Sequence, residues 1–440
     1  MSVLNEAKNL SKTEIYKIRK SNFCQAQSIS YENTEPLLIV RGEGAYLYDE
    51  NDNQYLDTRN NVCHVGHQNQ AVIQAVQAQI SELNSNTRYL HPNVCLLSEK
   101  LLETFPKELN KVFFVNSGSE ANDLALRLAY AHNKRKHKIV IEHGYHGHTQ
   151  AVIQISPYKF KKTNFIEERC EFTHVADCPD IKFGNHTKVE EYVSQIRKIT
   201  AENEVGSIFI ESGMSVGGVI LPPEGYLKEI FEIVRNKHGV CVCDEVQVGF
   251  GRFGKHFWAF QQQNVIPDIV TMGKPFGNGM PLAAVVTTEK IASDFAKGPE
   301  YFNTFGGNPV SAAAGLAVMD ELNKSGLQKN AEITGDYWIS ELNEIKLEFP
   351  ELILDVRGSG FFLGLHLIDD RVTSRLVGDL KNSHRILASI DGPKNNVIVF
   401  KPPMCFSKDN VDTLCVAIRE IISGFDLTEI YKQHFSHCPT

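Results

Sequence analysis

The sequence lacks features that define several classes of protein. No apolar run in its 440 residues reaches the length of a membrane span, and the first twenty, MSVLNEAKNLSKTEIYKIRK, lack the apolar stretch of a secretory signal. Basic residues are not in excess: the formal net charge is -8, which argues against a nucleic acid or an anionic membrane as the main partner. Glu6 and Glu14 are atypical of a transit peptide. We therefore expect a protein that acts on a small molecule, in the cytoplasm rather than in mitochondria.

Paired cysteine spacings, internal repeats and long linkers are also missing. The ten cysteines are scattered along the chain, so we interpret them as buried thiols in a reducing compartment rather than as a disulfide framework. With 440 residues and 42% hydrophobic content, the chain exceeds what one compact core usually needs. We therefore expect a large domain with a smaller companion.

Short apolar runs separated by helical stretches fill residues 62–322. The runs KVFFV, KIVIE, SIFIE, GVCVCDE and DIVTMG predict an α/β domain whose mostly parallel sheet lies between helices. Before them, VRGEGAYLYDENDNQYLD predicts a hairpin that turns at residues 50–53. We predict an N-terminal segment, residues 1–61, that packs with a smaller α+β domain formed by residues 323–440.

The run GVCVC reads as a strand buried on both faces, and it ends in two acids, Asp244 and Glu245. A buried carboxylate is costly unless it meets a cation or several donors. Ligands of parallel sheets bind beyond the carboxyl ends of the strands, which is where Asp244 is expected. The sequence therefore predicts a positively charged partner at the end of this strand.

The segment VFFVNSGSEANDLALRLAYA predicts a strand that turns into a helix through Ser117, Gly118 and Ser119. Ser117 and Glu120 have the spacing of a capping box, and Gly118 allows backbone amides to approach a ligand closely. Free N–H groups at such a helix start bind anions. The alternative is a capped helix without a ligand.

In TMGKPFGNG, Lys274 follows another apolar strand and stands between Gly273 and Pro275. Most lysines are solvated, and that remains the alternative here. A lysine pinned in a partly desolvated pocket has a lowered pKa and can form a Schiff base. A protonated pyridine ring would then be the cation that Asp244 meets.

The ordered motifs NSGSEAND, YHGH, DEVQVGFGR, TMGKP and NTFGGNP resemble the class III pyridoxal-phosphate aminotransferases over essentially the whole chain. The resemblance implies fold type I, bound pyridoxal 5'-phosphate, Lys274 as the Schiff-base lysine and Asp244 as the partner of the ring nitrogen. An acid there keeps the nitrogen protonated, so the ring can accept electrons. No role for a metal is implied, despite the three histidines of HGYHGH (143–148).

The same resemblance assigns further cofactor contacts. Gly118 and Ser119 would hold the cofactor phosphate, Tyr145 would stack on the ring, and Gln247 and Glu211 would lie near the ring hydroxyl and the reacting centre. Thr304 would reach the phosphate bound by the neighbouring subunit. The resemblance therefore implies an obligate homodimer with shared active sites, and leaves a tetramer open.

The segment VIVFKPPMCF points to one branch of the family. Amino-acid-specific members carry an arginine in an R-x-x-P-P pattern that binds the substrate carboxylate, and Val399 stands in its place. This segment, NNVCHVGH (60–67) and LNSNTRYLH (83–91) resemble the ethanolamine-phosphate and 5-phosphohydroxylysine phospho-lyases. The resemblance implies elimination of phosphate from a vicinal amino-phosphate such as phosphoethanolamine. We expect Arg88 and Lys401 to hold the substrate phosphate; the alternative is that both are surface cations.

Two other functions are weighed against the lyase. An ω-aminotransferase would need a keto acid acceptor, and a catalytically silent dimeric binding protein would be expected to lack Lys274 or Asp244, which are both present. The sequence departs from the animal lyases at HQNQAV (67–72) and CPDIKFGNHTK (178–188). These departures concern the pocket beyond the reacting unit, and hence whether the substrate carries a side chain.

Overall fold

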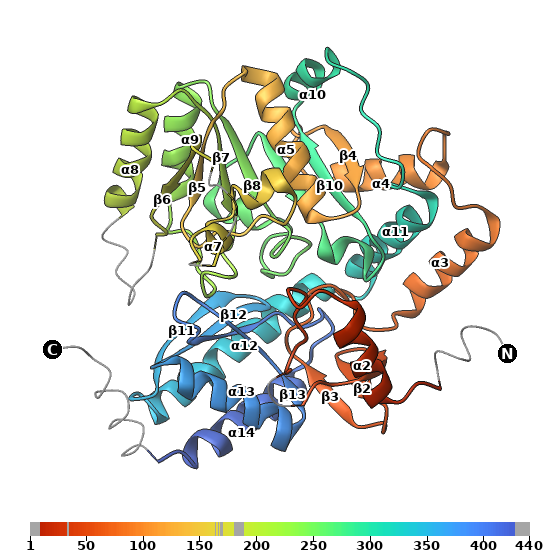
Figure 1. The fold of residues 1–440 in the computed structure, drawn as a ribbon, viewed down its shortest axis with the longest axis vertical. Coiled ribbons are helices and arrows are strands. Elements are labelled where there is room, and N and C mark those ends of the chain that lie inside the picture. Colours follow the sequence, from red (N-terminus) through yellow and green to blue (C-terminus); the bar gives the residue numbers. More distant parts are fainter. Residues whose placement is uncertain are drawn as a thin grey trace.

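The computed structural model describes residues 9–32, 35–162, 164–165, 167, 170–179 and 189–426. One half, in the upper part of Figure 1, contains a large sheet between helices. The other half brings the first and last parts of the chain together around two four-stranded sheets. Among the described residues, no helix is long and apolar enough to cross a membrane.

The N-terminal elements belong to the lower half. Helix α2 (Lys12–Asn22) starts with a capping box between Ser11 and Glu14 and is followed by strands β1 (Ile39–Glu43), β2 (Tyr46–Asp49) and β3 (Gln54–Asp57). The predicted turn at residues 50–53 joins β2 to β3, and the Asp49 carboxylate accepts hydrogen bonds from two backbone amides within it. On the other side of β3, β13 (Ile386–Leu387) pairs with it in parallel, so a strand from the C-terminal part completes this sheet.

The large sheet has the strand order β4-β10-β9-β8-β7-β5-β6. Its strands are β4 (Lys111–Val115), β5 (His137–Ile141), β6 (Thr173–Ala176), β7 (Val205–Glu211), β8 (Val240–Asp244), β9 (Ile269–Met272) and β10 (Ala283–Thr287). The five predicted runs all form strands, and the sheet is mostly parallel, as expected. Strand β10 is antiparallel to both β4 and β9, because the connection from Met272 to Ala283 is too short for a parallel crossover.

Helices cover both faces of the large sheet (Figure 1). Val240 and Val242 of β8 pack in one core cluster with α5 (Gly118–Asn133) and α10 (Glu289–Ala296), while Cys241 and Cys243 face the cluster that contains α8 (Val189–Glu202) and α9 (Tyr226–Asn236). Alternate residues of a strand point to opposite faces, so β8 contributes to both layers. This burial on both faces explains its continuous apolar sequence.

The remaining helices are distributed over the two halves. They are α3 (Gln70–Glu82), α4 (Pro92–Leu102), α6 (Gln150–Ile153), α7 (Pro157–Phe160), α11 (Pro309–Lys324), α12 (Leu327–Glu348), α13 (Asp370–His384) and α14 (Lys408–Ser423), with the 3-10 turns η3 (Ala259–Gln263) and η4 (Lys274–Gly277). The proposed boundary between residues 322 and 323 falls near the end of α11. Of the two departures from the animal lyases, HQNQAV contains the start of α3, and residues 180–188 lie outside the described part of the chain.

The C-terminal sheet has the order β11-β12-β15-β14, formed by β11 (Ile353–Ser359), β12 (Phe362–Leu367), β14 (Ser389–Asp391) and β15 (Val397–Phe400). Its core is continuous with that of the large half through the cluster that includes Trp338, Phe361 and Phe400. No disulfide forms among the nine described cysteines. Four of them are buried, but Cys24 and Cys95 are exposed, so the expectation of buried thiols holds for only part of the set.

Candidate active site

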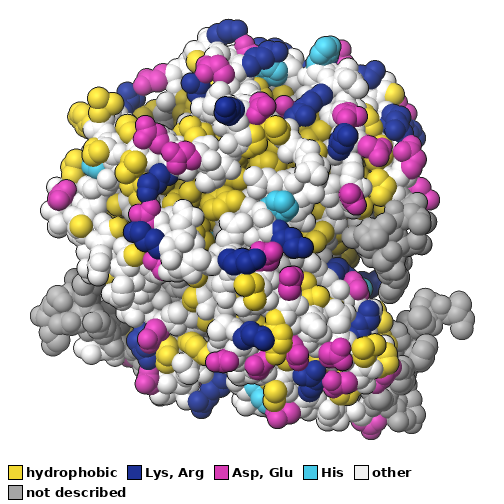
Figure 2. Space-filling model, turned by 180° about the vertical axis from the view of Figure 1, so that it is seen from behind, with side chains coloured by type: hydrophobic (Ala, Val, Ile, Leu, Met, Phe, Trp, Pro, Cys, Tyr) yellow, Lys and Arg dark blue, Asp and Glu magenta, His cyan; other side chains and the backbone are white. Residues whose placement is uncertain are grey.

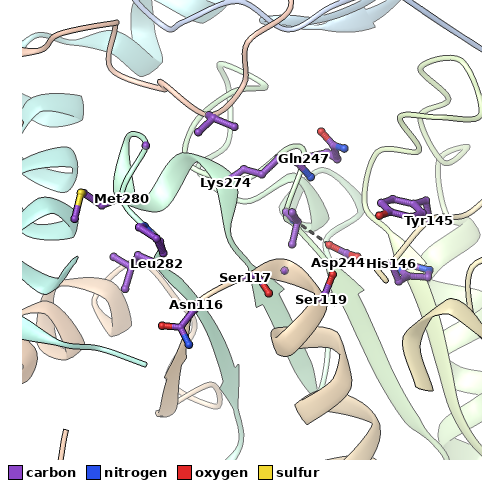
Figure 3. Close-up of a pocket in the computed structure, with 16 residues that line it drawn as sticks. Asn116, Ser117, Ser119, Tyr145, His146, Asp244, Gln247, Lys274, Met280 and Leu282 are labelled. Atoms are coloured by element: carbon purple, nitrogen blue, oxygen red, sulfur yellow. Dashed lines mark hydrogen bonds and ion pairs between the residues drawn. The ribbon is translucent and has the colours of Figure 1, made fainter. Parts of the chain in front are cut away.

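A cavity of about 400 Å³ opens where β8 and β9 end and α5 begins. Figure 3 shows Asp244 at the end of β8, Ser119 on the first turn of α5, and Lys274 after β9. Seven residues singled out from the sequence line this cavity: Ser117, Gly118, Ser119, Tyr145, Asp244, Gln247 and Lys274. They come from four separate segments of the chain, so the fold alone brings them together.

Asp244 is held by donors on several elements. Its Oδ2 accepts hydrogen bonds from Asn122 Nδ2 on α5 and from His146 Nδ1, both at 2.8 Å, and its Oδ1 accepts one from the Val246 amide at 3.0 Å. Because a carboxylate only accepts, His146 must carry its proton on Nδ1. These three hydrogen bonds fix the carboxylate in one orientation. The Asp244 side chain is 4% exposed and lines the cavity.

The neighbouring acid, Glu245, has a different environment. Its carboxylate accepts hydrogen bonds from the backbone amides of Ala259 and Phe260, each at 2.9 Å, at the start of η3. Burial raises the pKa of Glu245 to about 7. Of the two acids at the end of β8, Asp244 therefore serves the cavity and Glu245 satisfies the start of a turn.

The start of α5 presents backbone amides to the cavity. Ser117 is the N-cap and accepts from the Glu120 amide at 3.2 Å, as predicted. The reciprocal half of the predicted capping box is wrong: the Glu120 carboxylate accepts instead from the Asn116 amide and from the side chains of Asn116 and Asn303. A Cβ on Gly118 would stand 3.0 Å from the Val246 side chain, so glycine lets this turn approach the loop after β8.

The segment HGYHGH wraps over the same helix start. Gly147 has a φ of +136°, and a Cβ there would lie 2.5 Å from Ser119 Oγ. Ser119 Oγ accepts a hydrogen bond from the His148 amide at 3.1 Å. The close approach places Tyr145 beside the cavity, where burial raises its pKa to about 12 and keeps the phenol protonated. In the described residues no group of three or more potential ligands could hold a metal ion.

Lys274 occupies a strained position. Its φ is +24°, an uncommon value for a residue with a side chain, and Pro275 follows it. Burial lowers the pKa of Lys274, while the negative charges of Asp244 and Glu211 act in the opposite direction. A lysine with a lowered pKa is more often uncharged at neutral pH, which makes it a nucleophile and a base.

Glu211 and Gln247 lie at the same end of the sheet. Glu211 is paired with Asp244 in the register of β7 and β8, and it accepts hydrogen bonds from the Tyr145 amide at 3.0 Å and the Ser215 amide at 3.2 Å. Burial raises the pKa of Glu211 to about 7. Gln247 lines the cavity, and its side-chain oxygen accepts a hydrogen bond from Asn61.

The two cations predicted to bind the substrate phosphate lie in different environments. Lys401 is 7% exposed and its Nζ donates to Ser215 Oγ at 2.8 Å. Arg88 is on the surface, where its guanidinium pairs with Glu300 at 3.0 Å and lies 4.1 Å from the Phe302 ring centroid. Thr304 is also exposed, close in sequence to both of these partners. Within one chain, therefore, Arg88 and Thr304 are not brought to the cavity.

These residues fit pyridoxal 5'-phosphate. A fixed carboxylate can accept from a protonated ring nitrogen, a helix start can bind a phosphate, and a desolvated lysine can bind the aldehyde carbon. Fold and site together define a pyridoxal 5'-phosphate-dependent enzyme of fold type I. The family model for aminotransferase class-III matches residues 27–422, and the chain belongs to this family.

Several relatives are similar over nearly the whole chain. It is 45% identical over 442 residues to an alanine–glyoxylate aminotransferase 2-like protein of Drosophila melanogaster, covering 95% of this chain and 88% of the relative. It is 37% identical to ethanolamine-phosphate phospho-lyase homolog 1 of Caenorhabditis elegans, covering 94% of each. An Arthrobacter phospholyase, solved in complex with phosphoethanolamine, has a TM-score of 0.89 and 33% identity, with 94% of this chain and 100% of that chain covered.

Sequence reasoning missed several residues that shape the site. Asn122 and His146 both bind Asp244, and Ser215 joins Lys401 to Glu211. Asn122 was detectable in principle, because it lies four residues after Gly118 on the same face of a predicted helix. No local pattern pointed to Ser215, since Lys401, the partner of its side chain, stands 186 residues away.

Proposed function

We propose that the protein is a phospho-lyase that eliminates phosphate from a vicinal amino-phosphate such as phosphoethanolamine, giving an aldehyde, ammonia and phosphate. The observation that carries this proposal is the buried ammonium of Lys401, held by Ser215 within electrostatic reach of Lys274. A lysine ammonium binds a phosphate group as a point charge. The names of the worm relative and the Arthrobacter structure point in the same direction.

The chain's own residues have separate tasks in this reaction. The bound cofactor supplies an electron-accepting ring whose nitrogen stays protonated beside Asp244. Lys274, with its lowered pKa, removes a proton from the amino carbon of the substrate. Tyr145 covers one side of the cavity, and the start of α5 holds the cofactor phosphate, which leaves Lys401 for the phosphate of the substrate.

Val399 supports the lyase over amino-acid transamination. Its side chain is fully buried in an apolar cluster with Val219, Val248 and Phe253. An α-carboxylate placed against this cluster would lose its hydration without gaining a partner. A substrate without a carboxylate, such as phosphoethanolamine, carries no such cost.

The proposed site is completed by a second copy of the chain. Arg88 and Thr304 are exposed beside large apolar side chains that are also exposed: Tyr89, Leu90, Phe302 and Phe305. Figure 2 shows hydrophobic side chains gathered on one face of the large-sheet half. Exposed apolar groups of this extent are typical of an interface. We propose a homodimer in which Thr304 reaches the partner's cofactor phosphate and Arg88 the partner's substrate phosphate.

An ω-aminotransferase is the second candidate, favoured by the name of the Drosophila relative. The two functions differ in stoichiometry. The holoenzyme is incubated with phosphoethanolamine and no keto acid, and phosphate, ammonia and aldehyde are measured, with Lys274→Ala as the inactive control. The lyase predicts equal amounts of all three products. Turnover that requires pyruvate or 2-oxoglutarate and leaves the phosphate attached would establish the aminotransferase instead.

For the compartment, we propose the cytoplasm. No disulfide forms among the nine described cysteines, as expected in a reducing environment. Fluorescence microscopy of the tagged full-length chain tests this, and co-localisation with a mitochondrial marker would contradict it.

A further inference from the structure

The role of Lys401 inferred below rests on the proposed function, the elimination of phosphate. In this reaction the leaving group needs a proton. Breaking the carbon–oxygen bond of a phosphate monoester dianion leaves the electron pair on the bridging oxygen. Without a proton the product is the phosphate trianion, which is a far stronger base than hydrogenphosphate. A proton donor at the bridging oxygen therefore lowers the barrier, and such donors typically contribute about a hundredfold to ten-thousandfold in rate.

Lys401 directly follows strand β15 (Val397–Phe400), and its side chain is buried. Side chains at alternate positions of a strand share a face, so Val397, Val399 and Lys401 point the same way from β15 and its extension. Val397 and Val399 belong to one buried cluster with Val248, which follows the cavity residue Gln247 in sequence. The Lys401 amide donates to Thr58 O at 2.8 Å, which fixes the backbone at this point.

The ammonium of Lys401 is positioned by Ser215. The Lys401 Nζ to Ser215 Oγ distance is 2.8 Å, and Ser215 is fully buried. The Ser215 amide in turn donates to Glu211, the acid beside Asp244. The contact uses only one of the three donors of an ammonium, so others are available to a substrate phosphate.

Four charged groups face Lys401 from the elements around it. They are Asp391 on β14, Glu211 on β7, Lys274 on η4 and Arg252 in the loop after β8. Burial lowers the pKa of Lys401 to about 8; Asp391 and Glu211 oppose this shift, and Lys274 and Arg252 add to it. An acid with a pKa near the working pH is well suited to give up a proton during the reaction.

We propose that Lys401 is the proton donor to the departing phosphate, and not only a positive charge that binds it. Lys274 takes the proton from the amino carbon, and the carbon–oxygen bond breaks with its electron pair on the bridging oxygen. A proton then passes from Lys401 Nζ to that oxygen, so the product leaves as hydrogenphosphate. The remaining enamine takes up at its terminal carbon the proton that Lys274 removed, water converts the resulting imine to aldehyde and ammonia, and solvent returns the proton to Lys401. No oxidant or second substrate is required.

The test separates charge from proton donation. Lys401→Arg keeps a positive charge but cannot release a proton near neutral pH. Two substrates are compared: phosphoethanolamine, and ethanolamine O-sulfate, whose leaving sulfate is a weak base and needs no proton. We expect kcat for phosphoethanolamine to fall by about a hundredfold or more, while kcat for the sulfate ester stays near that of wild type. The Lys401→Arg holoenzyme should still bind inorganic phosphate, as measured by calorimetry.

Lys401→Met covers the case in which arginine does not fit the buried position. It removes both charge and proton, so binding of both substrates weakens, but the ratio of their kcat values should still shift toward the sulfate ester. Lys381→Met is a matched control, because Lys381 is 4% exposed and donates to a backbone carbonyl in the lower half of the molecule. This control should keep the wild-type ratio.

The pH dependence of kcat provides a second test of the proposal. Wild-type kcat for phosphoethanolamine should fall as the pH rises through about 8, because Lys401 loses its proton there, and the sulfate ester should not show this limb. Wild-type ratios in both Lys401 variants would overturn the proposal and leave Lys401 as a binding charge. Absence of phosphate release by the wild-type enzyme would instead refute the lyase function itself.

Discussion

Replacing Asp244 by asparagine tests the centre of the site with little change in shape. Asp244 receives three hydrogen bonds, from Asn122, His146 and Val246. An asparagine must point its NH2 group at one of these donors. Because Oδ2 has two donors and Oδ1 one, the NH2 group should take the Oδ1 side and face the Val246 amide. The variant therefore loses one protein hydrogen bond and the negative charge beside the ring nitrogen.

The lost charge sets the size of the effect. A hydrogen bond to a charged group contributes about 1.5 to 3 kcal/mol, and here the charge also keeps the ring nitrogen protonated. We expect the barrier to proton removal to rise by roughly 2.7 kcal/mol or more, which is about a hundredfold in rate. The cofactor should remain bound, since the start of α5 and Lys274 are unchanged.

The assay follows single-turnover consumption of substrate together with the absorbance of the bound cofactor. Glu245→Gln is the matched control: Glu245 is adjacent and also buried, but its carboxylate binds the amides of Ala259 and Phe260. It should lower Tm without changing the cofactor spectrum. If Asp244→Asn turns over at the wild-type rate, Asp244 is a structural acid and the assignment of the ring nitrogen is wrong.

Four further outcomes are expected. Lys274→Ala should lose the borohydride-reducible linkage between cofactor and protein while retaining cofactor, as read by mass spectrometry; a reducible linkage in this variant would show that another amine forms it. If each site takes Lys274 from one chain and Thr304 from the other, mixing Lys274→Ala chains with Thr304→Glu chains should restore about one quarter of the wild-type activity. Activity no greater than that of the separate variants would contradict the shared site. Val399→Arg should reduce phosphate release, lower Tm because a guanidinium is buried in an apolar cluster, and allow exchange between an amino acid and 2-oxoglutarate, with Val399→Met as the size control. Burial raises the pKa of Glu211 to about 7, above its value in the unfolded chain, so ionisation of Glu211 destabilises the fold as the pH rises from about 4.5 to 7. Glu211→Gln should therefore raise Tm relative to wild type more at pH 8 than at pH 5. An equal difference in Tm at both pH values would argue against the raised pKa.

The parts of the site that the sequence predicts are those in which local pattern and position coincide. Asp244 ends an apolar strand, Lys274 follows another beside a proline, and Gly118 opens a helix, so each could be placed at the carboxyl edge of a parallel sheet. Their presence around one cavity agrees with that reasoning, while their individual roles stay predictions.

The remainder depended on contacts that a linear pattern does not contain. Nothing near Arg88 in the sequence distinguishes a residue that serves its own cavity from one exposed on the surface, and the structure places it beside Glu300. Glu120 had the spacing of a capping box, but Asn116 and Asn303 compete for its carboxylate. The antiparallel orientation of β10 follows from the length of one connection, which is visible only once both neighbouring strands are located.

The positive φ of Lys274 has an evolutionary consequence. A residue with a side chain in such a region costs about 1 to 3 kcal/mol, and glycine carries no comparable penalty. Lys274→Gly should therefore relax the backbone and partly offset the loss of side-chain packing. A gene copy released from selection for catalysis would carry this backbone strain without any catalytic benefit. Its retention at a strained position is a continuing cost, and selection for the chemistry must outweigh it in every generation.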